Sequence, residues 1–389
     1  MSSAILSLNA GSSSLKFALF DTAGSLTVTV RGEIEDLDSA PHFTAHDAAG
    51  KVLAEQRLAA GFDGALHALL DFTDHHLGHD GLAAVGHRIV HGGAVHIAPE
   101  IVTPALLTAL DALTPLDPLH MPDNLAPVRA IATARPGLPQ VACFDTAFHH
   151  TMPPVATRFA LPQAITAAGV RRYGFHGLSY EYIAGCLTRQ SPRLAQGRTI
   201  VAHLGSGASL CALKNGQSIE TTFGFSVLDG LVMATRCGSL DPGVILFLGR
   251  QGHSFTDIED MLYHRSGLLG VSGISGDIRV LLASQDRLAR EAIELFTYRI
   301  AAETGALISA LGGLDGLVFT AGIGEHAPAI RSAVCERLGW LGLRLDPAAN
   351  AAGPGCISAK DSAIEVRVIA TDEEAMIAHH TLAVLATPG

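Results

Sequence analysis

The chain has no block of lysine or arginine residues and carries little charge of either sign. Lys and Arg number 26 and Asp and Glu 37, which gives a formal net charge of −11 over 389 residues. Nucleic acids and anionic membranes bind proteins through concentrated positive patches, so we expect neither as a partner. Charged residues make up only 16% of the chain and hydrophobic residues 48%. This balance excludes a disordered chain, and the length favours two domains with large cores.

Cysteines are few and have no regular spacing. The six residues include no Cys-x-x-Cys pair and no zinc-ligand pattern: Cys143, Cys186, Cys211, Cys237, Cys335 and Cys356. We interpret them as small buried thiols in a reducing cytoplasm. No uninterrupted apolar run approaches the roughly 18 residues of a membrane span, and no signal-peptide pattern opens the chain. We therefore expect a soluble, cytoplasmic protein without a membrane partner.

Several familiar catalytic motifs are also missing. The chain has no G-x-S-x-G nucleophile elbow, no H-E-x-x-H zinc motif, no Walker lysine motif and no correctly placed Rossmann glycine fingerprint. A nucleotide or phosphate site in this chain must therefore be built from other elements.

The stretch Ile5–Phe20 has the composition of a phosphate-binding hairpin. Two apolar runs typical of strands flank the small polar turn Asn9–Ser14, and Lys16 lies just beyond it. Small residues allow the backbone to approach an anion, whose oxygens accept hydrogen bonds from N–H and O–H groups. A serine-rich surface hairpin explains this stretch alone equally well, because short Gly/Ser turns are common between strands.

A second stretch, Thr199–Leu213, repeats this design of apolar run, small-residue turn and apolar run. Its turn spans Gly205–Ser209. Two such hairpins about half a chain apart predict a duplicated α/β domain. A cleft between two such domains could hold a polyphosphate from both sides. The Met-Pro-Pro break at Met152 marks the boundary between them.

Two arginines and one aspartate occur in unusually apolar surroundings. Arg88 lies within a short apolar strand, and Arg236 lies in a weakly charged segment that contains glycine. A charged side chain in such a setting is costly unless it faces a ligand or a partner. Arg88 is therefore an anion clamp or half of a structural ion pair, and the sequence leaves both open. Asp145 ends a buried strand, where open α/β folds place their sites.

Three further features add a histidine, a glycine-rich turn and a carboxylate to these unusual positions. His176 lies on a glycine-flanked turn before a helix, and Leu314–His326 is a strand followed by a glycine-rich turn into a helix. Glu373 lies in the first turn of the final helix, which a capping-box pattern opens. Its carboxylate either complements the helix dipole or serves as a metal ligand. Together these features favour phosphoryl transfer by positioning and charge neutralisation.

The chain resembles the acetate kinase family, within the superfamily of sugar kinases, heat-shock chaperone ATPases and actin. The resemblance runs from end to end and lies in motifs that follow the family's order: LNAGSSSLKFAL, VGHRIVHGG, CFDTAFHHTMP, RRYGFHGLS, AHLGSGASL, TRCGSLDPG, FTAGIGEH and ATDEEAMIA. It implies an α/β fold of two duplicated ribonuclease-H-like domains with a nucleotide cleft between them. These would be residues 1–150 with the final helix 372–389, and residues 151–371. It also implies a homodimer that reversibly transfers a phosphoryl group from ATP to acetate, directly and in line, with Mg²⁺ or Mn²⁺.

The resemblance also assigns roles to individual residues. Four match the family's catalytic groups: Arg88, Asp145, His176 and Arg236. The two arginines would grip the substrate carboxylate and the moving phosphoryl group, and His176 would donate a hydrogen bond to that group. A carboxylate substrate is already ionised near neutrality, so we expect Asp145 to orient an arginine or a metal-bound water instead of acting as a base. The substrate pocket would be formed by Arg88, Val90, Leu119, His120, Phe175 and Val227.

The nucleotide and metal residues are carried over in the same way. The ATP site would comprise Ser12, Ser14, Lys16, His203, Leu204, Gly205, Ser206, Gly207, Asp277, Ile278, Arg279, Gly322, Ile323, Gly324, Glu325 and His326. Asn9 and Glu373 would lie beside the metal ion. ATP and acetate are thus the expected small-molecule partners.

The chain departs from the family's usual pattern at several positions. Ser206 and Val227 replace a usual Asn and Pro, Met121, His326 and Asp372 each replace Asn, and Ala234–Ser239 reads A-T-R-C-G-S where G-T-R-S-G-D is usual. Because a methylene in an acyl pocket is worth only about 1–3 kcal/mol, Val227 leaves the choice between acetate and propionate open. The alternatives are an actin- or chaperone-like nucleotide switch and a binding-only paralogue. The retained charged groups favour an active kinase.

Overall fold

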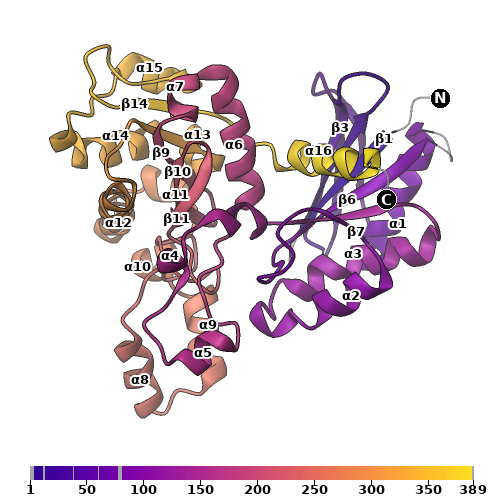
Figure 1. Cartoon of the computed structure of the whole chain (residues 1–389), viewed down its shortest axis with the longest axis horizontal. Coiled ribbons are helices and arrows are strands. Elements are labelled where there is room, and N and C mark those ends of the chain that lie inside the picture. The colour runs from indigo at the N-terminus through magenta and orange to yellow at the C-terminus, as the bar shows by residue number, and fades with distance from the viewer. Residues whose placement is uncertain (1–3, 12–13, 38, 60, 78–80, 388–389) are drawn as a thin grey trace. The chain divides into compact units, whose positions relative to one another are not determined.

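The chain forms two compact units (Figure 1), residues 1–147 together with 372–389, and residues 148–371. The computed structural model describes residues 4–11, 14–37, 39–59, 61–77 and 81–387. Each unit is built on one mixed β-sheet with a hydrophobic core of its own. Within the described ranges, no helix is both long enough and apolar enough to cross a membrane.

The first unit contains an eight-stranded sheet in the order β5-β4-β3-β2-β1-β6-β8-β7. Its strands are β1 (Ala4–Ala10), β2 (Leu15–Asp21), β3 (Thr27–Glu35), β4 (His42–Asp47), β5 (Val52–Arg57), β6 (Leu82–Ile89), β7 (Glu100–Ile101) and β8 (Gln140–Phe144). β1 and β2 form the predicted hairpin, in which Asn9 pairs with Lys16. β6 runs parallel to both β1 and β8, so these three strands end at the same edge of the sheet.

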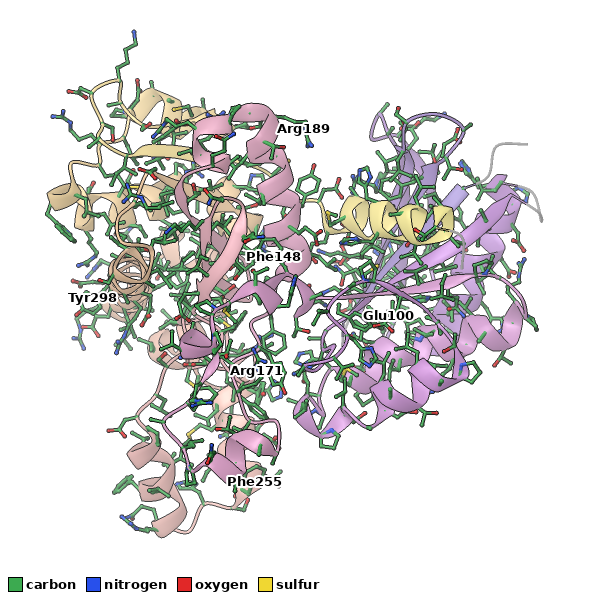
Figure 2. The ribbon with its side chains drawn as sticks, viewed as in Figure 1. Glu100, Phe148, Arg171, Arg189, Phe255 and Tyr298 are labelled. Carbon is green, nitrogen blue, oxygen red and sulfur yellow. The ribbon has the colours of Figure 1, made fainter. Side chains whose placement is uncertain are left out.

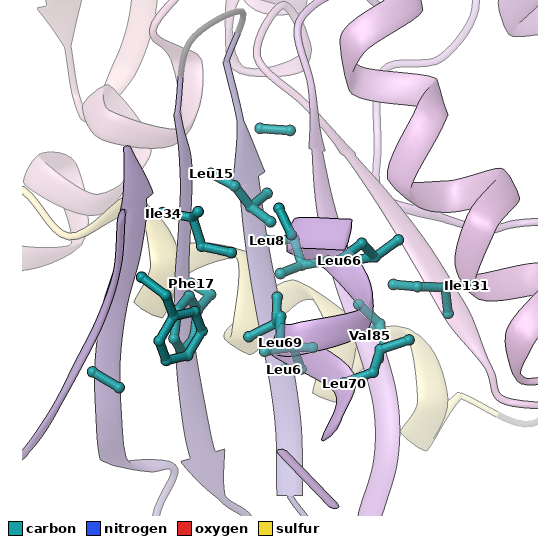
Figure 3. Close-up of a cluster of buried hydrophobic side chains, with 14 of the residues drawn as sticks. Leu6, Leu8, Leu15, Phe17, Ile34, Leu66, Leu69, Leu70, Val85 and Ile131 are labelled. Atoms are coloured by element: carbon teal, nitrogen blue, oxygen red, sulfur yellow. The ribbon is translucent and has the colours of Figure 1, made fainter. Parts of the chain in front are cut away.

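Strand β1 contributes to a core on each face of this sheet because successive side chains of a strand point to opposite faces. Leu6 and Leu8 belong to a large cluster that includes Leu66 and Leu69 of α1 (Figure 3). Ile5 packs instead in a cluster with Ala378 of α16. The helices of the first unit are α1 (Phe62–Leu77), α2 (Pro104–Asp111), η1 (Thr114–Leu116), α3 (Met121–Ala134) and α16 (Glu373–Ala386).

A glycine in β6 allows α16 to pack closely on the sheet. A Cβ atom at Gly86 would lie 2.2 Å from Oγ1 of Thr381 and 2.6 Å from a methyl carbon of Ile377, both on α16. No larger residue fits without displacing the helix. The last helix of the chain is therefore an integral part of the first unit.

The second unit contains a six-stranded sheet in the order β11-β10-β9-β12-β14-β13. Its strands are β9 (Arg198–Leu204), β10 (Ala208–Lys214), β11 (Gln217–Thr221), β12 (Gly316–Thr320), β13 (Gly355–Cys356) and β14 (Glu365–Val368). An antiparallel meander is followed by two parallel strands and a short antiparallel edge strand. In the first sheet, the six neighbouring strands β3-β2-β1-β6-β8-β7 have the same order and relative directions. The predicted duplication of an α/β fold is therefore confirmed.

The helices of the second unit surround this sheet and extend beyond it. They are α4 (Pro154–Thr157), α5 (Gln163–Ala167), α6 (Gly177–Gln190), α7 (Pro192–Ala195), α8 (Pro242–Arg250), α9 (Phe255–His264), α10 (Gly267–Ser272), α11 (Ile278–Ala283), α12 (Arg287–Leu311), α13 (Ala321–His326), α14 (Pro328–Arg337), α15 (Pro347–Ala352) and η3 (Gly339–Leu341), with η2 (Ala147–Thr151) at the junction of the units. Tyr180 and Ile183 of α6 pack on Val201 and Val318 of the sheet. This packing fixes α6, whose first turn follows His176.

All six cysteines are free thiols, but not all are buried as the sequence predicted. Four are buried and Cys237 is partly exposed, whereas Cys356 is exposed. Cys356 lies in β13, a two-residue strand at the edge of the second sheet. An edge strand this short has no neighbour to cover its outer side, which explains the exception.

Candidate active site

Four polar side chains of the first unit meet at the edge where β1, β6 and β8 end. Arg88 donates from Nε and Nη2 to Oδ2 of Asp145, at 2.9 and 2.5 Å. Arg88 Nη1 also donates to Oδ1 of Asn9, at 3.3 Å. Asn9 Nδ2 donates to Oε2 of Glu373 at 3.0 Å, and this oxygen lies 4.0 Å from Nε of Arg88. The structure thus brings together one predicted arginine and three predicted oxygen-bearing groups.

This cluster places one guanidinium beside two carboxylates in a largely buried setting. The Asp145 side chain is fully buried, and those of Arg88 and Glu373 are 19% and 16% exposed. Burial alone would lower the pKa of Arg88, but the carboxylates of Asp145 and Glu373 outweigh it and raise that pKa. Burial also raises the pKa of Glu373 above its usual range; Arg88 opposes this shift and Asp145 reinforces it. Arg88 is therefore a permanent cation, whereas ionised Glu373 would be stabilised by a further positive charge.

The cluster answers the question that the sequence left open about Arg88. Its guanidinium is paired with Asp145, so it is part of an ion pair. The same side chain remains partly exposed, so it can also reach a ligand. Asp145 holds the guanidinium by two N–H groups and thereby fixes its plane, a geometry that suits recognition of a carboxylate or phosphoryl group.

The predicted acyl-pocket residues of the first unit lie on the segments next to Arg88. Val90 is buried, and its N–H donates to Oδ1 of Asn124 at 2.7 Å, while Asn124 Nδ2 donates to the carbonyl of Ala10 at 2.8 Å. Leu119 is 37% exposed, and His120 Nδ1 lies 2.8 Å from Oδ1 of Asp117. Asn124, which the sequence analysis missed, ties the ends of β1 and β6 together. Its position as a polar residue on the apolar face of α3 could have revealed it.

In the second unit, His176 and Arg236 converge over the turn that follows β9. A Cβ atom at Gly207 would lie 3.3 Å from Nε2 of His176 and 4.0 Å from Nη1 of Arg236. Arg236 Nη1 donates to the carbonyl of Val227 at 3.2 Å. Two nitrogen-bearing side chains over a small-residue turn form a suitable site for an anion.

The His176 side chain is held by several neighbours. Its Nδ1 lies 2.9 Å from Oγ of Ser209, its ring stacks on that of His203 at 4.0 Å between centroids, and its edge meets Phe223. His203, predicted to contact ATP, hydrogen bonds through Nδ1 to Oγ of Ser179 at 2.8 Å. Phe175 is buried and packs against Phe223 in the same region.

A cavity of about 820 Å³ lies beside this turn in the second unit. It is lined by Gly205, Ser206, Ala234, Gly276, Asp277, Ile278, Arg279, Leu282, Gly322, Ile323, His326, Ala327, Pro328 and Ala329. Eight of these belong to the predicted ATP site. The others are small or apolar residues next to the predicted motifs, which give no chemical pattern of their own in the sequence. The predicted glycine-rich turn after β12 is itself the short helix α13.

The other predicted ATP residues lie elsewhere. Leu204 and Gly207 are next in sequence to the cavity-lining Gly205 and Ser206 but do not line the cavity. The carbonyls of Gly324 and Glu325 accept hydrogen bonds from the buried guanidinium of Arg331. Lys16 lines a hollow of about 310 Å³ in the first unit. The carbonyl of Ser14 accepts from the N–H of Gly11 at 2.8 Å. Ser12 lies outside the described residues.

The metal-binding prediction can be tested against the chemistry of the donor groups. Within the described ranges, no group of three or more His, Cys, Asp or Glu side chains could hold a metal ion. Asn9 and Glu373 nevertheless offer oxygen ligands of the kind that Mg²⁺ prefers, and this ion commonly binds through one or two carboxylates with water and substrate phosphates. Asn9 and Glu373 therefore fit Mg²⁺ or Mn²⁺ as two of its ligands, with water and substrate phosphates as the others.

A duplicated α/β fold with a nucleotide-sized cavity in one unit and an arginine–carboxylate cluster in the other defines a small-molecule kinase. The chain belongs to the acetokinase family, whose model matches residues 4–379. A relative from Rhodopseudomonas palustris, named acetate kinase, is 53% identical over 98% of both chains. A relative of the same name from Rhizobium meliloti is 47% identical over 99% of both chains. The predicted membership of this family is confirmed.

Solved structures show the same similarity. A propionate kinase from Francisella tularensis is 36% identical, with a TM-score of 0.91 over 98% of this chain and 100% of that one. The acetate kinase of Porphyromonas gingivalis is also 36% identical, with a TM-score of 0.88 and the same coverage. The predicted fold is confirmed, and the protein is a kinase. Full-length similarity to such enzymes disfavours the nucleotide-switch alternative.

Proposed function

We propose that the protein reversibly transfers the γ-phosphoryl group of ATP to acetate, giving acetyl phosphate and ADP. The observation that carries this proposal is 53% identity, along almost the whole chain, to a protein named acetate kinase. An oxygen of the acetate carboxylate forms the new bond to phosphorus as the bond to the ADP oxygen breaks. No proton needs to be removed from the carboxylate, because it is ionised near neutral pH.

Arg88 and Asp145 would form the acceptor side of this site. Arg88 would bind the acetate carboxylate and then the equatorial oxygens of the transferring group, where charge is spread in the transition state. Asp145 would keep the guanidinium in plane through its two hydrogen bonds of 2.9 and 2.5 Å. This role agrees with one of the two expected from the sequence, the orientation of an arginine.

Asn9 and Glu373 would hold a divalent cation, for which we propose Mg²⁺, with Mn²⁺ as a substitute. The ion would neutralise charge on the phosphate oxygens of the nucleotide. Glu373 must be ionised to serve in this way, and the nearby Arg88 favours the ionised form. Asn9 is hydrogen bonded to the side chains of Glu373 and Arg88 and would keep both in place.

His176 and Arg236 would form the phosphoryl side of the site. Their nitrogens lie over the Gly205–Ser209 turn, beside the cavity that we propose for ATP. Direct in-line transfer requires the groups of this side and those of the acceptor side to bind the same phosphoryl group. Five predicted ATP residues of the second unit do not line the cavity and would support its walls or its opening: His203, Leu204, Gly207, Gly324 and Glu325.

The identity of the acid remains part of the proposal. The solved relatives include one named propionate kinase and one named acetate kinase, at the same 36% identity. Val227 is 7% exposed, and its backbone carbonyl accepts a hydrogen bond from Arg236, so this residue lies close to the proposed phosphoryl site. We propose acetate as the preferred acid, with propionate as the main competitor.

We also propose a homodimer in the cytoplasm. Helix α8 has no buried residue, although four consecutive residues in it are apolar. These are between 39% and 60% exposed: Val244, Ile245, Leu246 and Phe247. Phe255 at the start of α9, labelled in Figure 2, is 80% exposed. Such an apolar surface suits contact with a second copy. Light scattering should give twice the chain mass, and Phe247→Asp should shift it to the monomer, while Leu288→Asp on α12 should not.

One assay tests the kinase proposal as a whole. The protein is incubated with ATP, Mg²⁺ and hydroxylamine, together with acetate, propionate or butyrate, and the acyl hydroxamate is measured. We expect the highest kcat/KM with acetate. Hydroxamate from none of these acids would overturn the proposal and leave the binding-only paralogue. A higher kcat/KM with propionate would correct the substrate alone.

A further inference from the structure

The backbone of His176 adopts a conformation that side chains rarely occupy. Its φ and ψ angles are 60° and 25°, in the left-handed region, and α6 begins at the next residue. For residues other than glycine this conformation costs on the order of 1–3 kcal/mol, so the surrounding structure must hold it in place. One residue that holds this segment is His149, whose Nε2 lies 3.0 Å from the carbonyl oxygen of the preceding residue, Phe175.

Two hydroxyl groups continue from the His176 ring into the core of the second unit. Oγ of Ser209, on β10, lies 2.9 Å from Nδ1 of His176 and 2.5 Å from the hydroxyl of Tyr180. Tyr180 lies in the first turn of α6, and its N–H donates to the carbonyl of His176 at 3.0 Å, so both residues lie at the start of this helix. Ser209 and Tyr180 are both completely buried. The three groups therefore form a hydrogen-bonded chain that ends at the imidazole.

The direction of this chain decides which ring nitrogen carries the proton. Each hydroxyl has one proton to donate. If Tyr180 donates to Ser209, then Ser209 donates to Nδ1, and the proton of the neutral imidazole must lie on Nε2. The opposite direction would place the proton on Nδ1 and make Nε2 an acceptor. A phenol is the stronger donor of the two hydroxyls, which favours the first arrangement.

The other ring nitrogen points to the site where a proton is useful. Nε2 of His176 lies over Gly207, as does Nη1 of Arg236. A phosphoryl oxygen bound there would accept hydrogen bonds, so Nε2 must be a donor. With the proton on Nδ1, the lone pair of Nε2 would face the phosphoryl oxygen and repel it.

We propose that Ser209 and Tyr180 are positioning residues that fix the tautomer of His176, so that Nε2 presents its proton to the transferring phosphoryl group. This inference rests on the proposed kinase function. Neither residue would touch a substrate, and both would act only through His176. Tyr180 contributes the proton that orients Ser209, and Ser209 passes that orientation to the ring.

A double-mutant cycle tests this coupling. Ser209→Ala should lower kcat about 10- to 100-fold, less than the roughly 10²- to 10³-fold for complete loss of an oriented transition-state donor, and leave KM for ATP and for acetate within about threefold. Tyr180→Phe should lower kcat by less, and Ser209→Thr, which keeps the hydroxyl, should recover most of it. In a His176→Ala background, Ser209→Ala should have no further effect on kcat. Equal effects of Ser209→Ala in both backgrounds would overturn the proposal.

The tautomer can also be observed without measuring activity. In protein labelled with ¹⁵N-histidine, at pH 8, the His176 ring should show a protonated Nε2 and an unprotonated Nδ1, with the signals assigned by their loss in His176→Ala. Ser209→Ala should give a mixture of tautomers. A wild-type ring protonated on Nδ1 would overturn the proposal even in an active kinase. Absence of kinase activity with the expected tautomer would instead refute the proposed function alone.

A control variant separates this effect from the general loss of a buried hydroxyl. Thr304 on α12 is buried, and its hydroxyl donates to the carbonyl of Ile300 at 2.7 Å. Thr304→Val should leave kcat within about twofold. It removes a buried hydroxyl whose hydrogen bond is of similar strength, but this hydroxyl lies elsewhere in the unit and outside the hydrogen-bonded chain at His176. If Ser209→Ala fails to fold, the tautomer of the wild-type ring and the kcat of Tyr180→Phe decide the question.

Discussion

One carboxylate oxygen of Asp145, Oδ2, accepts two hydrogen bonds from Arg88, at 2.9 Å from Nε and 2.5 Å from Nη2. The carboxylate is fully buried, whereas the guanidinium keeps 19% of its side-chain surface exposed. The pair is therefore asymmetric: the anion is enclosed by the protein, and the cation reaches the surface of the unit. We propose that in this arrangement Asp145 orients Arg88 and does not contact the substrate itself.

Replacing Asp145 should reduce transfer by disordering Arg88. Asp145→Asn keeps an acceptor oxygen but removes the charge that holds the guanidinium, and breaking a buried ion pair costs about 3–5 kcal/mol. We expect kcat/KM for acetate to fall at least 100-fold in the hydroxamate assay. The matched control is Asp111→Asn, which breaks the exposed pair with Arg129 in the same unit and should change kcat/KM by less than about twofold. Similar effects of the two substitutions would contradict the role given to Asp145.

Replacing Arg236 should remove charge stabilisation on the phosphoryl side. Arg236→Ala should lower kcat/KM by about 10²- to 10³-fold, as loss of a transition-state donor does. Arg236→Lys should recover only part of it, because lysine cannot reproduce the planar fork of hydrogen bonds. The control is Arg287→Ala, whose guanidinium is 74% exposed on α12 and pairs with Glu291. Near-normal turnover of Arg236→Ala would exclude this residue from the mechanism.

The two hairpins were predictable from sequence because each depends on local pattern. Apolar runs around turns of small residues specify adjacent antiparallel strands, and the structure has β1–β2 and β9–β10 there. The cluster at Arg88 depends instead on strand order. Asn9 and Glu373 are 364 residues apart and meet only because α16 returns to the first sheet. Without the family resemblance, the sequence pattern alone gives no reason for that return.

Other site residues were missed although the sequence contained a local indication. Tyr180 lies four residues after His176, so the two are close in the chain. Ser209, its partner in the hydrogen-bonded chain, closes the second predicted turn. Serine is common in turns, and a tyrosine in a helix often packs in the core, so neither residue was distinguishable from a structural residue before the ring of His176 was placed.

Stability should depend on pH through the buried imidazole of His87. Burial lowers the pKa of His87 to about 4, partly opposed by its hydrogen bond to Gln140. The pKa of His87 is lower in the folded than in the unfolded protein. The contribution of its neutral imidazole to the free energy of unfolding is therefore fully present above pH 6.5 and is lost as the pH falls towards 4. The loss amounts to roughly 3 kcal/mol over that range.

The expected result is a lower melting temperature at pH 5 than at pH 7. His87→Gln should reduce this difference, because glutamine does not titrate, even if the variant is less stable at both pH values. His91, whose pKa burial also lowers to about 4, should account for part of what remains. His67→Gln, at an exposed position of α1, is the control and should leave the difference unchanged. If His87→Gln also leaves it unchanged, His87 does not carry the pH dependence.

The packing of α16 on β6 should couple the stability of the first unit to its proposed metal site. Gly86→Ala would place a Cβ atom 2.2 Å from Oγ1 of Thr381, and α16 must move to relieve the contact. Since Glu373 begins this helix, its carboxylate would move with it, away from Asn9 and Arg88. We expect a lower melting temperature, by an amount typical of overpacking at about 1–3 kcal/mol, and a higher Mg²⁺ concentration for half-maximal kinase activity. Gly24→Ala, where a Cβ atom would meet nothing within 4 Å, should change neither quantity. A destabilised Gly86→Ala variant with an unchanged Mg²⁺ requirement would show that α16 does not position the metal ligand.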